Sequence, residues 1–376
     1  MRLTLAALCS ICSLVASGTT IHIPADQPTI QAGIDAASQG DTVLVAPGTY
    51  TGDGNRDIDF GGTDLVLISE EGAEATVIDC EGSRTDYHRG FDFHMGESAA
   101  AVIEGFTIRG GYVGGDFPSR VGGGIRCAPG SPTLLSCIIT ENSAISAGGI
   151  YCADGSMPVL ADCTISHNTS RAYSGGGLYC ALSSSSPVLT DCAIVSNYSN
   201  GHGGGIACWG SCVYPTEPVL VNCVIADNSA DANGGAFYGY GYGCGTFPIL
   251  INCIVANNSA FGGGGLFLSH DCSPSLTNCI IAGNSALRTG GGVDCASSSP
   301  ILSNCTIAGN TAEDGGGISC YSNWMISPAE PVLTNCVLWS NTPDAVYNDP
   351  YDPGYPVFTY CDIEGGGWFG AGNIDA

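Results

Sequence analysis

The amino-acid sequence predicts an all-β solenoid, in which short coils of chain stack along one axis. Three observations lead to this prediction: a motif that recurs every 25 to 31 residues, 56 glycines among 376 residues, and 21 cysteines that mostly occupy fixed places in the repeat. Runs of glycine disfavour helical repeats, because each glycine costs about 1 kcal/mol in a helix interior. One repeat cannot bury its own apolar side, so neighbouring repeats must stack and share a core.

The first 18 residues are predicted to be a signal peptide. Arg2 precedes an apolar run over residues 3–15, and the small residues Ala16, Ser17 and Gly18 follow where a signal peptidase would cut. No later apolar run approaches the roughly 20 residues that a membrane helix needs. We therefore expect Sec export to the extracellular space or the outer cell surface, with no transmembrane segment.

The charge of the chain restricts its partners. The formal net charge is -26, with only 9 basic residues. Nucleic-acid binding is excluded, because it needs lysine and arginine to displace counterions from phosphates. Neutral glycans, cations and basic surfaces remain, and the same acidity would also serve solubility alone.

The repeat aligns on Pro-x-Leu-x-x-Cys, and its nine copies begin between Pro132 and Pro356. The ladder cysteines of these copies are Cys137, Cys163, Cys192, Cys223, Cys253, Cys279, Cys305, Cys336 and Cys361. Five residues beyond each of the first eight stands an asparagine, namely Asn142, Asn168, Asn197, Asn228, Asn258, Asn284, Asn310 and Asn341. A glycine block and a second short strand follow, and all variation in length falls in the loops outside the Pro-to-Asn block.

Each repeat is expected to add one strand to the same parallel sheets. The alternation in Cys-x-Ile is typical of a strand with one face inward. Stacked coils would place equivalent residues about 4.8 Å apart. We predict that the eight asparagines form a ladder in which each side-chain amide bonds the next. A leucine-rich repeat is the rival reading, because Leu160, Ile165 and Asn168 fit its frame, but its helical half is missing.

These motifs resemble those of a known superfamily. Residues 20–50, TIHIPADQPTIQAGIDAASQGDTVLVAPGTY, resemble the N-terminal cap of right-handed parallel β-helices of the pectin-lyase-like superfamily, with a strand, an amphipathic helix over 30–37 and another strand. The repeats, best seen in IADNSADANGGAF at 225–237, are similar to those of polymorphic outer-membrane proteins. The resemblance implies a signal peptide at 1–18, a cap and irregular coils at 19–126, regular coils at 127–361 and an incomplete end at 362–376.

The cysteines are predicted to form one disulfide in each coil. Eight of the ladder cysteines have another cysteine shortly before them, and where that position is lost, at Gly239 and Leu268, a cysteine appears nearby. We hypothesise pairing among Cys127, Cys137, Cys152, Cys163, Cys180, Cys192, Cys208, Cys223, Cys244, Cys253, Cys272, Cys279, Cys295, Cys305, Cys320 and Cys336. Export permits such bonds. A reduced ladder of buried thiols is the alternative, and zinc is disfavoured because no paired C-x-x-C occurs.

The sequence predicts no catalytic residue and no metal site. Gly201-His202-Gly203 matches the G-H-G of polygalacturonases, but none of the companion motifs is present. One stretch, 84–126, could supply a base beside carboxylates. Among its charged residues are Arg84, His88, Arg89, Asp92, His94, Glu104, Arg109, Asp116, Arg120 and Arg126. No cofactor is predicted; calcium, which pectate lyases use, has no residues assigned to it.

A binding surface is predicted on the long loops, with the alternative that the rings fold over their own loops. Its residues are Trp209, Tyr214, Tyr238, Tyr240, Tyr242 and Trp324. Such rings offer flat apolar faces with polar tips. We expect a non-enzymatic, adhesin-like protein that binds a polysaccharide or cell-surface component; the alternative is a polysaccharide lyase, hydrolase or epimerase. The chain is expected to be a monomer or to associate end to end, since its last coil lacks a cap.

Overall fold

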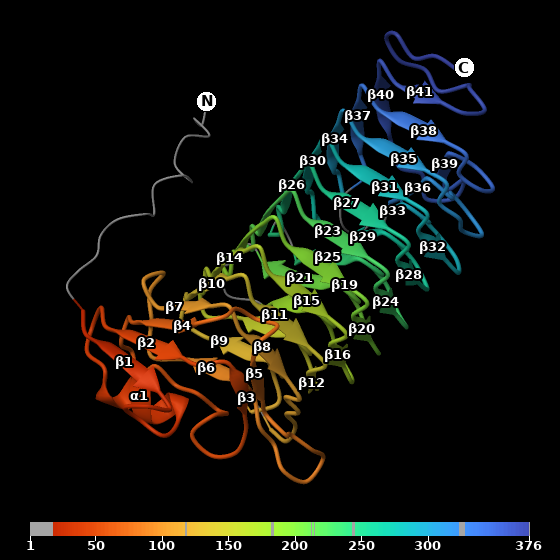
Figure 1. Cartoon of the computed structure of the whole chain (residues 1–376). Helices are drawn as coiled ribbons and strands as arrows, with labels where there is room; N and C mark the ends of the chain where they lie inside the picture. The colour runs from red at the N-terminus through yellow and green to blue at the C-terminus, as the bar shows by residue number, and fades with distance from the viewer. Residues whose placement is uncertain are drawn as a thin grey trace.

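The computed structural model is a right-handed parallel β-solenoid of about 11 turns with one short helix near the N-terminus (Figure 1). It confirms the predicted fold class. It describes residues 18–375 except 117–118, 182–183, 212, 214, 243–244 and 323–327, and describes no side chain for Ser211 and Tyr242. The predicted signal peptide therefore lies, apart from Gly18, outside the described residues.

Each coil runs in turn through a thirteen-stranded, a twelve-stranded, a six-stranded and a ten-stranded sheet, although the first coils lack some strands. All named strand pairs are parallel. The thirteen-stranded sheet comprises β1 (Thr20–Ile23), β2 (Thr42–Val45), β4 (Val66–Ser69), β7 (Val102–Glu104), β10 (Thr133–Leu135), β14 (Val159–Ala161), β18 (Val188–Thr190), β22 (Val219–Val221), β26 (Ile249–Ile251), β30 (Ser275–Thr277), β34 (Ile301–Ser303), β37 (Val332–Thr334) and β40 (Val357–Thr359). The twelve-stranded sheet comprises β3 (Gly48–Tyr50), β5 (Thr76–Asp79), β8 (Thr107–Arg109), β11 (Ile138–Thr140), β15 (Thr164–Ser166), β19 (Ala193–Val195), β23 (Val224–Ala226), β27 (Ile254–Ala256), β31 (Ile280–Ala282), β35 (Thr306–Ala308), β38 (Val337–Trp339) and β41 (Asp362–Ile363).

The other two sheets close the coil. The six-stranded sheet comprises β12 (Ser143–Ala144), β16 (Thr169–Ser170), β20 (Tyr198–Ser199), β24 (Ser229–Ala230), β28 (Ser259–Ala260) and β32 (Ser285–Ala286). The ten-stranded sheet comprises β6 (Phe91–Phe93), β9 (Ile125–Cys127), β13 (Ile150–Cys152), β17 (Leu178–Cys180), β21 (Ile206–Ser211), β25 (Phe237–Tyr242), β29 (Leu266–Ser269), β33 (Val293–Ala296), β36 (Ile318–Tyr321) and β39 (Val346–Asn348). Because the register is residue over residue, a row of equivalent side chains runs the length of each sheet.

The core is built from the alternate residues that face inward. Leu134 pairs in register with Leu160, and both are buried, as are the equivalent residues of the other coils. The helix α1 (Ile30–Ala36) closes the first coil, and it buries Ile30 and Ile34. Thr29 caps the helix, because its hydroxyl accepts a hydrogen bond from the backbone N–H of Ala32. The predicted helix at 30–37 thus ends one residue earlier than expected.

The structure brings the eight predicted asparagines into one buried ladder after the twelve-stranded sheet. Asn142 Nδ2 donates to Asn168 Oδ1 at 3.1 Å, and each later asparagine repeats this bond to the next. Each Nδ2 also donates to a backbone carbonyl of the preceding coil, as Asn228 does to Ile194 at 2.9 Å. These side chains are at most 6% exposed. Within the described coils the ladder therefore leaves no amide donor without a partner.

A second polar ladder lies on the surface, between the thirteen- and twelve-stranded sheets, and the sequence did not lead us to predict it. Its members hold a left-handed backbone, as at Asn252 with φ of 55°. Their amides donate along the axis from Asn222 to Asp191, Asn252 to Asn222, Asn278 to Asn252, Asn304 to Asn278, and Asn335 to Asn304.

The glycine blocks stand where successive coils approach most closely. Gly175 has a φ of +70°, which disfavours side chains with a Cβ. A Cβ on Gly176 would lie 2.3 Å from the carbonyl oxygen of Gly204 in the next coil. A stretch such as residues 304–320, poor in apolar mass, therefore packs against its equivalents above and below.

The predicted disulfide in each coil is not found. All 17 cysteines that the structure describes are buried free thiols, and Cys212 and Cys244 lie outside the described residues. The two cysteines of one coil belong to separate rows, in which thiols of neighbouring coils meet. Thus the thiols of Cys127 and Cys152 share a hydrogen bond, and so do those of Cys137 and Cys163.

The replacement of cysteine at Gly239 has a packing explanation. A Cβ built on Gly239 would lie 2.2 Å from Cys272 Sγ. The thiol of Cys272 therefore fills the space that the glycine leaves in the row, and it is fully buried there. The compensation that suggested a bonding partner is thus the filling of a core gap.

Among the described residues, no helix is long and apolar enough to cross a membrane.

Candidate functional site

The outer face of the ten-stranded sheet differs from the other outer faces because its side chains change from coil to coil. The outward middle residues of its strands form what we name the central row: Asp92, Arg126, Tyr151, Tyr179, Ala207, Tyr238, Phe267, Asp294, Ser319 and Tyr347. The outward residues two positions further along form the lateral row: His94, Ala128, Ala153, Ala181, Trp209, Tyr240, Ser269, Ala296 and Tyr321. The central row has one alanine and the lateral row has four, and two hollows lie beside small residues of the lateral row.

The first hollow has a volume of about 520 Å³. It is lined by Arg120, Val121, Ser146, Tyr151, Ala172, Tyr173, Ser174, Tyr179, Ala181, Gly201, His202 and Trp209. Three alanines in succession occupy the lateral row here, between His94 and Trp209. Four coil spacings separate those two residues, which is about 19 Å at 4.8 Å per strand. We name this strip of the outer face, from His94 to Trp209, the groove. Of its three alanines only Ala181 lines the hollow, whereas Ala128 and Ala153 are buried in a small apolar cluster with Val121.

Trp209 closes one end of this groove. Its ring stacks on Tyr240 of the next coil, with centroids 5.0 Å apart. Its other face is directed toward the coil of Ala181, where the first hollow lies. Its Nε1 is buried and has no hydrogen-bond partner among the described residues. Trp209 thus borders the hollow with an aromatic face, while its indole N–H is buried.

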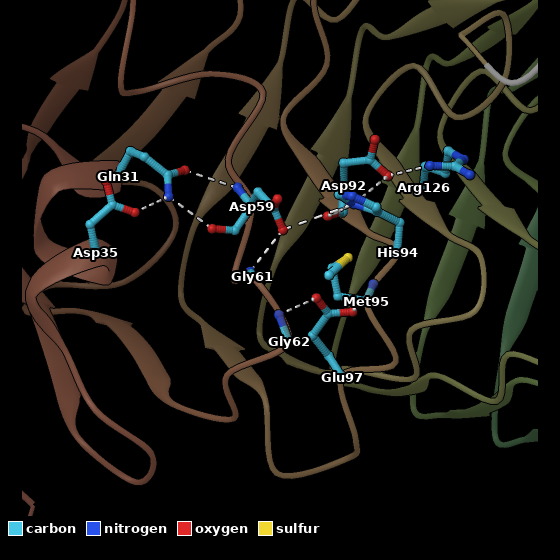
Figure 2. Close-up of polar contacts among 10 residues, drawn as sticks. All are labelled: Gln31, Asp35, Asp59, Gly61, Gly62, Asp92, His94, Met95, Glu97 and Arg126. Atoms are coloured by element: carbon cyan, nitrogen blue, oxygen red, sulfur yellow. Dashed lines mark hydrogen bonds and ion pairs between the residues drawn. The ribbon is translucent and has the colours of Figure 1, made fainter.

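Charged side chains occupy the opposite end (Figure 2). Asp59, Asp92 and Arg126 stand above one another on three successive coils. Arg126 Nη1 donates to Asp92 Oδ1 at 2.8 Å. His94 Nδ1 lies 3.8 Å from Asp92 Oδ1 and 3.9 Å from Asp59 Oδ1. The imidazole is therefore held between two carboxylates, and it is 38% exposed at the surface.

The cap helix and a neighbouring turn hold this charged end in place. Gln31 of α1 brackets Asp59, donating from Nε2 to its carbonyl and accepting from its N–H, both at 2.9 Å. Glu97 is 2% exposed and accepts from the N–H groups of Gly62 and Met95. Figure 2 shows these contacts on both sides of Asp59.

Three of the chain's nine basic residues converge near this end of the groove. Arg126 Nε and Arg89 Nη1 are buried without a partner among the described residues. Burial lowers the pKa of Arg89, and Asp92 opposes that shift. Arg120 lines the first hollow, with its guanidinium 5.6 Å from the ring centroid of Tyr173. Of these three, Arg120 places its positive charge beside the aromatic lining of the hollow, whereas Arg126 is paired with Asp92 and Arg89 is buried.

A second hollow of about 300 Å³ lies beyond the stack of Trp209 and Tyr240. It is lined by Asn233, Tyr238, Tyr240, Phe267, Ser269, His270, Ala296, Ser297 and Tyr321. The small residues Ser269 and Ala296 interrupt the lateral row here. Tyr240 and Tyr321 stand on either side, three coil spacings or about 14 Å apart.

Three of the six predicted aromatic side chains are described, Trp209, Tyr238 and Tyr240, and these three do not form one exposed flank. Tyr238 is 5% exposed and stacks on Phe267 and His202, so its ring is covered by other side chains. Trp209 and Tyr240 line the two hollows. Tyr214, Trp324 and the side chain of Tyr242 lie outside the described residues. The described rings therefore stack over their own strands and do not form an open binding surface. Trp209 is the exception, because it borders the first hollow.

The predicted charged stretch is divided among three sheets. Asp92, His94 and Arg126 share the groove. Arg109 lies on the twelve-stranded sheet, where its Nε donates to Asp79 at 3.0 Å. Glu104 lies on the thirteen-stranded sheet. His88 bonds Asp57 beside the buried Arg89.

His202, from the G-H-G sequence, fills the gap that Ala207 leaves in the central row. Its ring stacks on Tyr238 with centroids 4.3 Å apart, and its Nδ1 accepts from the N–H of Asn233. Burial lowers its pKa, so the ring is neutral at pH 7. The alanines of the lateral row were not predicted. They could have been found in the sequence, because each directly follows the cysteine of the short strand after a glycine block.

Among the described residues, no group of three or more histidine, cysteine, aspartate or glutamate side chains is arranged to hold a metal ion.

The family described as "Right handed beta helix region" matches residues 54–244 and 212–357. The solved A-module of the mannuronan C-5 epimerase AlgE4 from Azotobacter vinelandii is similar, with a TM-score of 0.55 and 16% identity over 92% of this chain and 94% of that chain. The catalytic unit of an alpha-1,3-glucanase from Streptomyces thermodiastaticus gives 0.48 and 13%, over 96% and 70%. The pectate lyase Pel9A gives 0.41 and 15%, over 89% and 72%. No curated protein matches the sequence.

Proposed function

Because this chain belongs to the family of right-handed β-helix regions, we propose that it binds a segment of glycan in the groove of the ten-stranded sheet. The observation that carries this proposal is the run of alanines between His94 and Trp209. Ala181, the last of these alanines, lines the first hollow, and Trp209 lines the same hollow beside it. Sugars bind such faces through their apolar C–H surface, while indole N–H groups donate to their hydroxyls.

The charged end supports an acidic glycan over a neutral one. Arg120 lines the hollow, and Arg126 lies on the same outer face, one coil before Tyr151. Arginine suits carboxylate and sulfate groups, because its planar fork donates two parallel hydrogen bonds. A sugar unit with such a group would lie over Tyr151, and the next units would extend toward Trp209.

The solved structures that resemble this chain support a carbohydrate ligand by their titles, which name an epimerase of mannuronan and a glucanase. The predicted signal peptide supports a site of action outside the cell, where structural polysaccharides occur. An adhesin-like role follows if the groove binds and releases glycan unchanged.

A screen of acidic and neutral oligosaccharides tests the proposal. The purified chain is compared with Trp209→Ala and with Trp339→Ala, in which a tryptophan is removed from the outer face of β38, where it is 37% exposed. We expect an acidic oligosaccharide to bind, with affinity reduced at least tenfold by Trp209→Ala and unchanged by Trp339→Ala. Absence of any binding, or an equal loss in the two variants, would contradict the proposal.

Cleavage of the bound glycan is a second candidate function, favoured by the position of His94 between Asp59 and Asp92. An imidazole and two carboxylates can exchange a proton with a sugar ring or a glycosidic oxygen. Arg126 would then neutralise negative charge that develops on the substrate. This cluster comes close to the requirement for an enzyme, which is converging acids with a base in one groove.

The two functions are separated by product analysis on the oligosaccharides that bind. Cleavage predicts new chain ends from the wild type and none from Asp92→Asn or His94→Gln, with binding retained. Unchanged substrate after prolonged incubation would leave glycan binding as the function. Turnover that persists in both variants would place the chemistry elsewhere.

A further inference from the structure

The buried asparagine ladder ends at Asn341, beside a hollow near the C-terminal end of the solenoid, where β39 and β41 lie (Figure 1). We name it the terminal hollow, and its volume is about 620 Å³. Its lining includes Asn341, Asp344, Ala345, Glu364, Gly366 and Trp368. Asn341 is 6% exposed, so a buried amide of the ladder borders an open space.

Asn341 has hydrogen-bond donors that no described residue accepts. One rung earlier, Asn310 donates to Asn341 Oδ1 from its backbone N–H at 3.1 Å and from Nδ2 at 2.9 Å. Asn341 Nδ2 donates to the carbonyl of Ile307 at 2.8 Å, but Asn341 has no next asparagine to bond. Its backbone N–H and its second Nδ2 hydrogen find no acceptor among the described residues. Because buried donors without partners cost free energy, the last rung lacks one acceptor oxygen.

A glycine stands where the next asparagine would be. Leu338 pairs in register with Ile363, so Gly366 is the equivalent of Asn341. Gly366 has a φ of 60°, and its two glycine neighbours also have a positive φ, whereas Asn341 does not. These glycines turn the chain away from the path of the earlier coils. The oxygen that each inner rung receives from the next coil is therefore missing, and the terminal hollow lies in its place.

The terminal hollow also offers acceptors beside these donors. Glu364 Oε2 accepts from the N–H of Ser340, so this carboxylate lies next to the last rung. Glu364 and Asp344 are exposed, and both line the hollow. Two acids disfavour a carboxylate ligand by like-charge repulsion. A neutral amide fits the lining, because its oxygen accepts from Asn341 and its N–H donates to Glu364.

Trp368 gives the terminal hollow an aromatic wall. Its ring packs against Phe358, with centroids 5.3 Å apart, and also lines the hollow. Ala345 and Val346 add apolar surface to the lining. A sugar ring can lie on an indole face through its C–H surface. The volume of the hollow is also in the range of pockets that hold small ligands.

We propose that the terminal hollow binds an N-acetylated sugar unit, whose acetamido oxygen takes the place of the missing asparagine oxygen. The acetamido N–H donates to Glu364, and the sugar ring lies on Trp368. This site is separate from the groove, because β21, which carries Trp209, and β39 are five coil spacings apart. That separation is about 24 Å at 4.8 Å per strand.

N-Acetylglucosamine is the probe, and glucose, which has a hydroxyl in place of the acetamido group, is the matched control. Binding to the whole chain is measured by ligand-detected magnetic resonance and by tryptophan fluorescence. We expect saturable binding of N-acetylglucosamine, at least tenfold tighter than that of glucose. Propionamide, which mirrors an asparagine side chain, should bind more weakly than the sugar. Binding of propionamide without binding of the sugar would assign the hollow to a carboxamide ligand and overturn the proposal.

Two variants locate the sugar. Trp368→Ala should weaken its binding at least tenfold, whereas Trp339→Ala, on the outer face of β38, should leave it unchanged. Asn341→Asp keeps the Oδ1 that accepts from Asn310 and removes the Nδ2 donor, so it should also weaken binding at least tenfold. Thermal unfolding shows whether Asn341→Asp folds, and Trp368→Ala decides the test if it does not.

Variants of the first hollow separate this site from the glycan site. Trp209→Ala and Ala181→Leu should leave the affinity for N-acetylglucosamine unchanged. A loss in either variant would place the sugar in the first hollow and overturn the proposal. It would also be overturned by the absence of saturable binding, by equal affinity for glucose, or by equal losses in Trp368→Ala and Trp339→Ala.

Discussion

The buried asparagine ladder and the outer face of the ten-stranded sheet are built by the same repeat in the same register, yet they treat polar atoms in opposite ways. In the ladder each amide bonds the next asparagine and a backbone carbonyl. On the outer face, Arg126 Nε, Trp209 Nε1, Asp294 Oδ1 and Ser319 Oγ are buried without partners. Since unpaired buried groups cost free energy, they indicate a face adapted to a ligand, whereas the ladder serves stability.

The largest effect is expected from breaking the ladder. Asn228→Ala would remove the acceptor of the Asn197 backbone N–H and the side-chain donor to Ile194 O, both buried. It would also remove one of the bonds of Asn197 Nδ2 and one of those of Asn258 Oδ1. We expect a loss of about 4 kcal/mol in the free energy of unfolding, since each orphaned group costs about 1–3 kcal/mol. Denaturant unfolding measures it. The control is Asn278→Asp in the exposed ladder, which keeps a residue tolerant of the left-handed backbone and removes the bond to Asn252. Because water replaces that bond, we expect a loss of less than about 1 kcal/mol; equal losses would argue against the distinction.

The next largest effect is expected from Asp294, because burying its ionised carboxylate destabilises the folded chain. Its pKa is raised from 3.8 to about 7 in the folded chain. The folded state therefore holds the proton more tightly, so the stability that it gives is present below pH 4 and lost as the pH rises through 7. Relative to the wild type, Asp294→Asn should gain about 2–4 kcal/mol between pH 4 and pH 8.

Unfolding at several pH values measures this gain. The matched control is Asp227→Asn, an exposed aspartate at a turn, which should show no such trend. A parallel pH dependence in wild type and Asp294→Asn would mean that Asp294 is ionised or solvated in the folded chain.

Filling the groove should abolish ligand binding without loss of stability. Ala181→Leu places a larger side chain in the first hollow, which we expect to weaken glycan binding at least tenfold by steric exclusion. Ala256→Leu, on the outer face of β27, is the control. Titration with the glycan that binds the wild type measures the affinity of both variants. Retained affinity in Ala181→Leu would show that the glycan does not bind in the first hollow.

The smallest effect is expected from Arg126. Arg126→Gln should weaken an acidic glycan by about threefold to tenfold at low salt, since the group is partly screened. A neutral glycan of the same length should bind equally well to both proteins. The difference should shrink at high salt, and a salt-independent difference would point to altered packing around Asp92.

The sequence allowed the fold and the asparagine ladder to be predicted, because both follow from strict spacing. The fixed Pro-to-Asn distance can only arise from coils in register, and buried amides must bond along the axis. The groove was not predicted, since it depends on which residue follows the short strand after each glycine block. Ala153 and Ala181 are unremarkable in the sequence, and they matter only because Trp209 stands next in the same row.

The disulfide prediction failed for a related reason. Cys127 and Cys137 are close together along the chain, but spacing alone does not show in which direction their side chains point. They belong to separate rows and meet the cysteines of other coils. Likewise, Cys272 looked like a displaced bonding partner, whereas it fills the space beside Gly239.

Hydrogen–deuterium exchange with and without a bound oligosaccharide tests most directly whether the outer face of the ten-stranded sheet is the ligand surface. The account predicts slower exchange over β13, β17 and β21 and their adjoining turns at residues 120–121, 172–174 and 201–203, with no change in β22, β26 or β27. Protection confined to the thirteen- and twelve-stranded sheets, or none at saturating glycan, would contradict it.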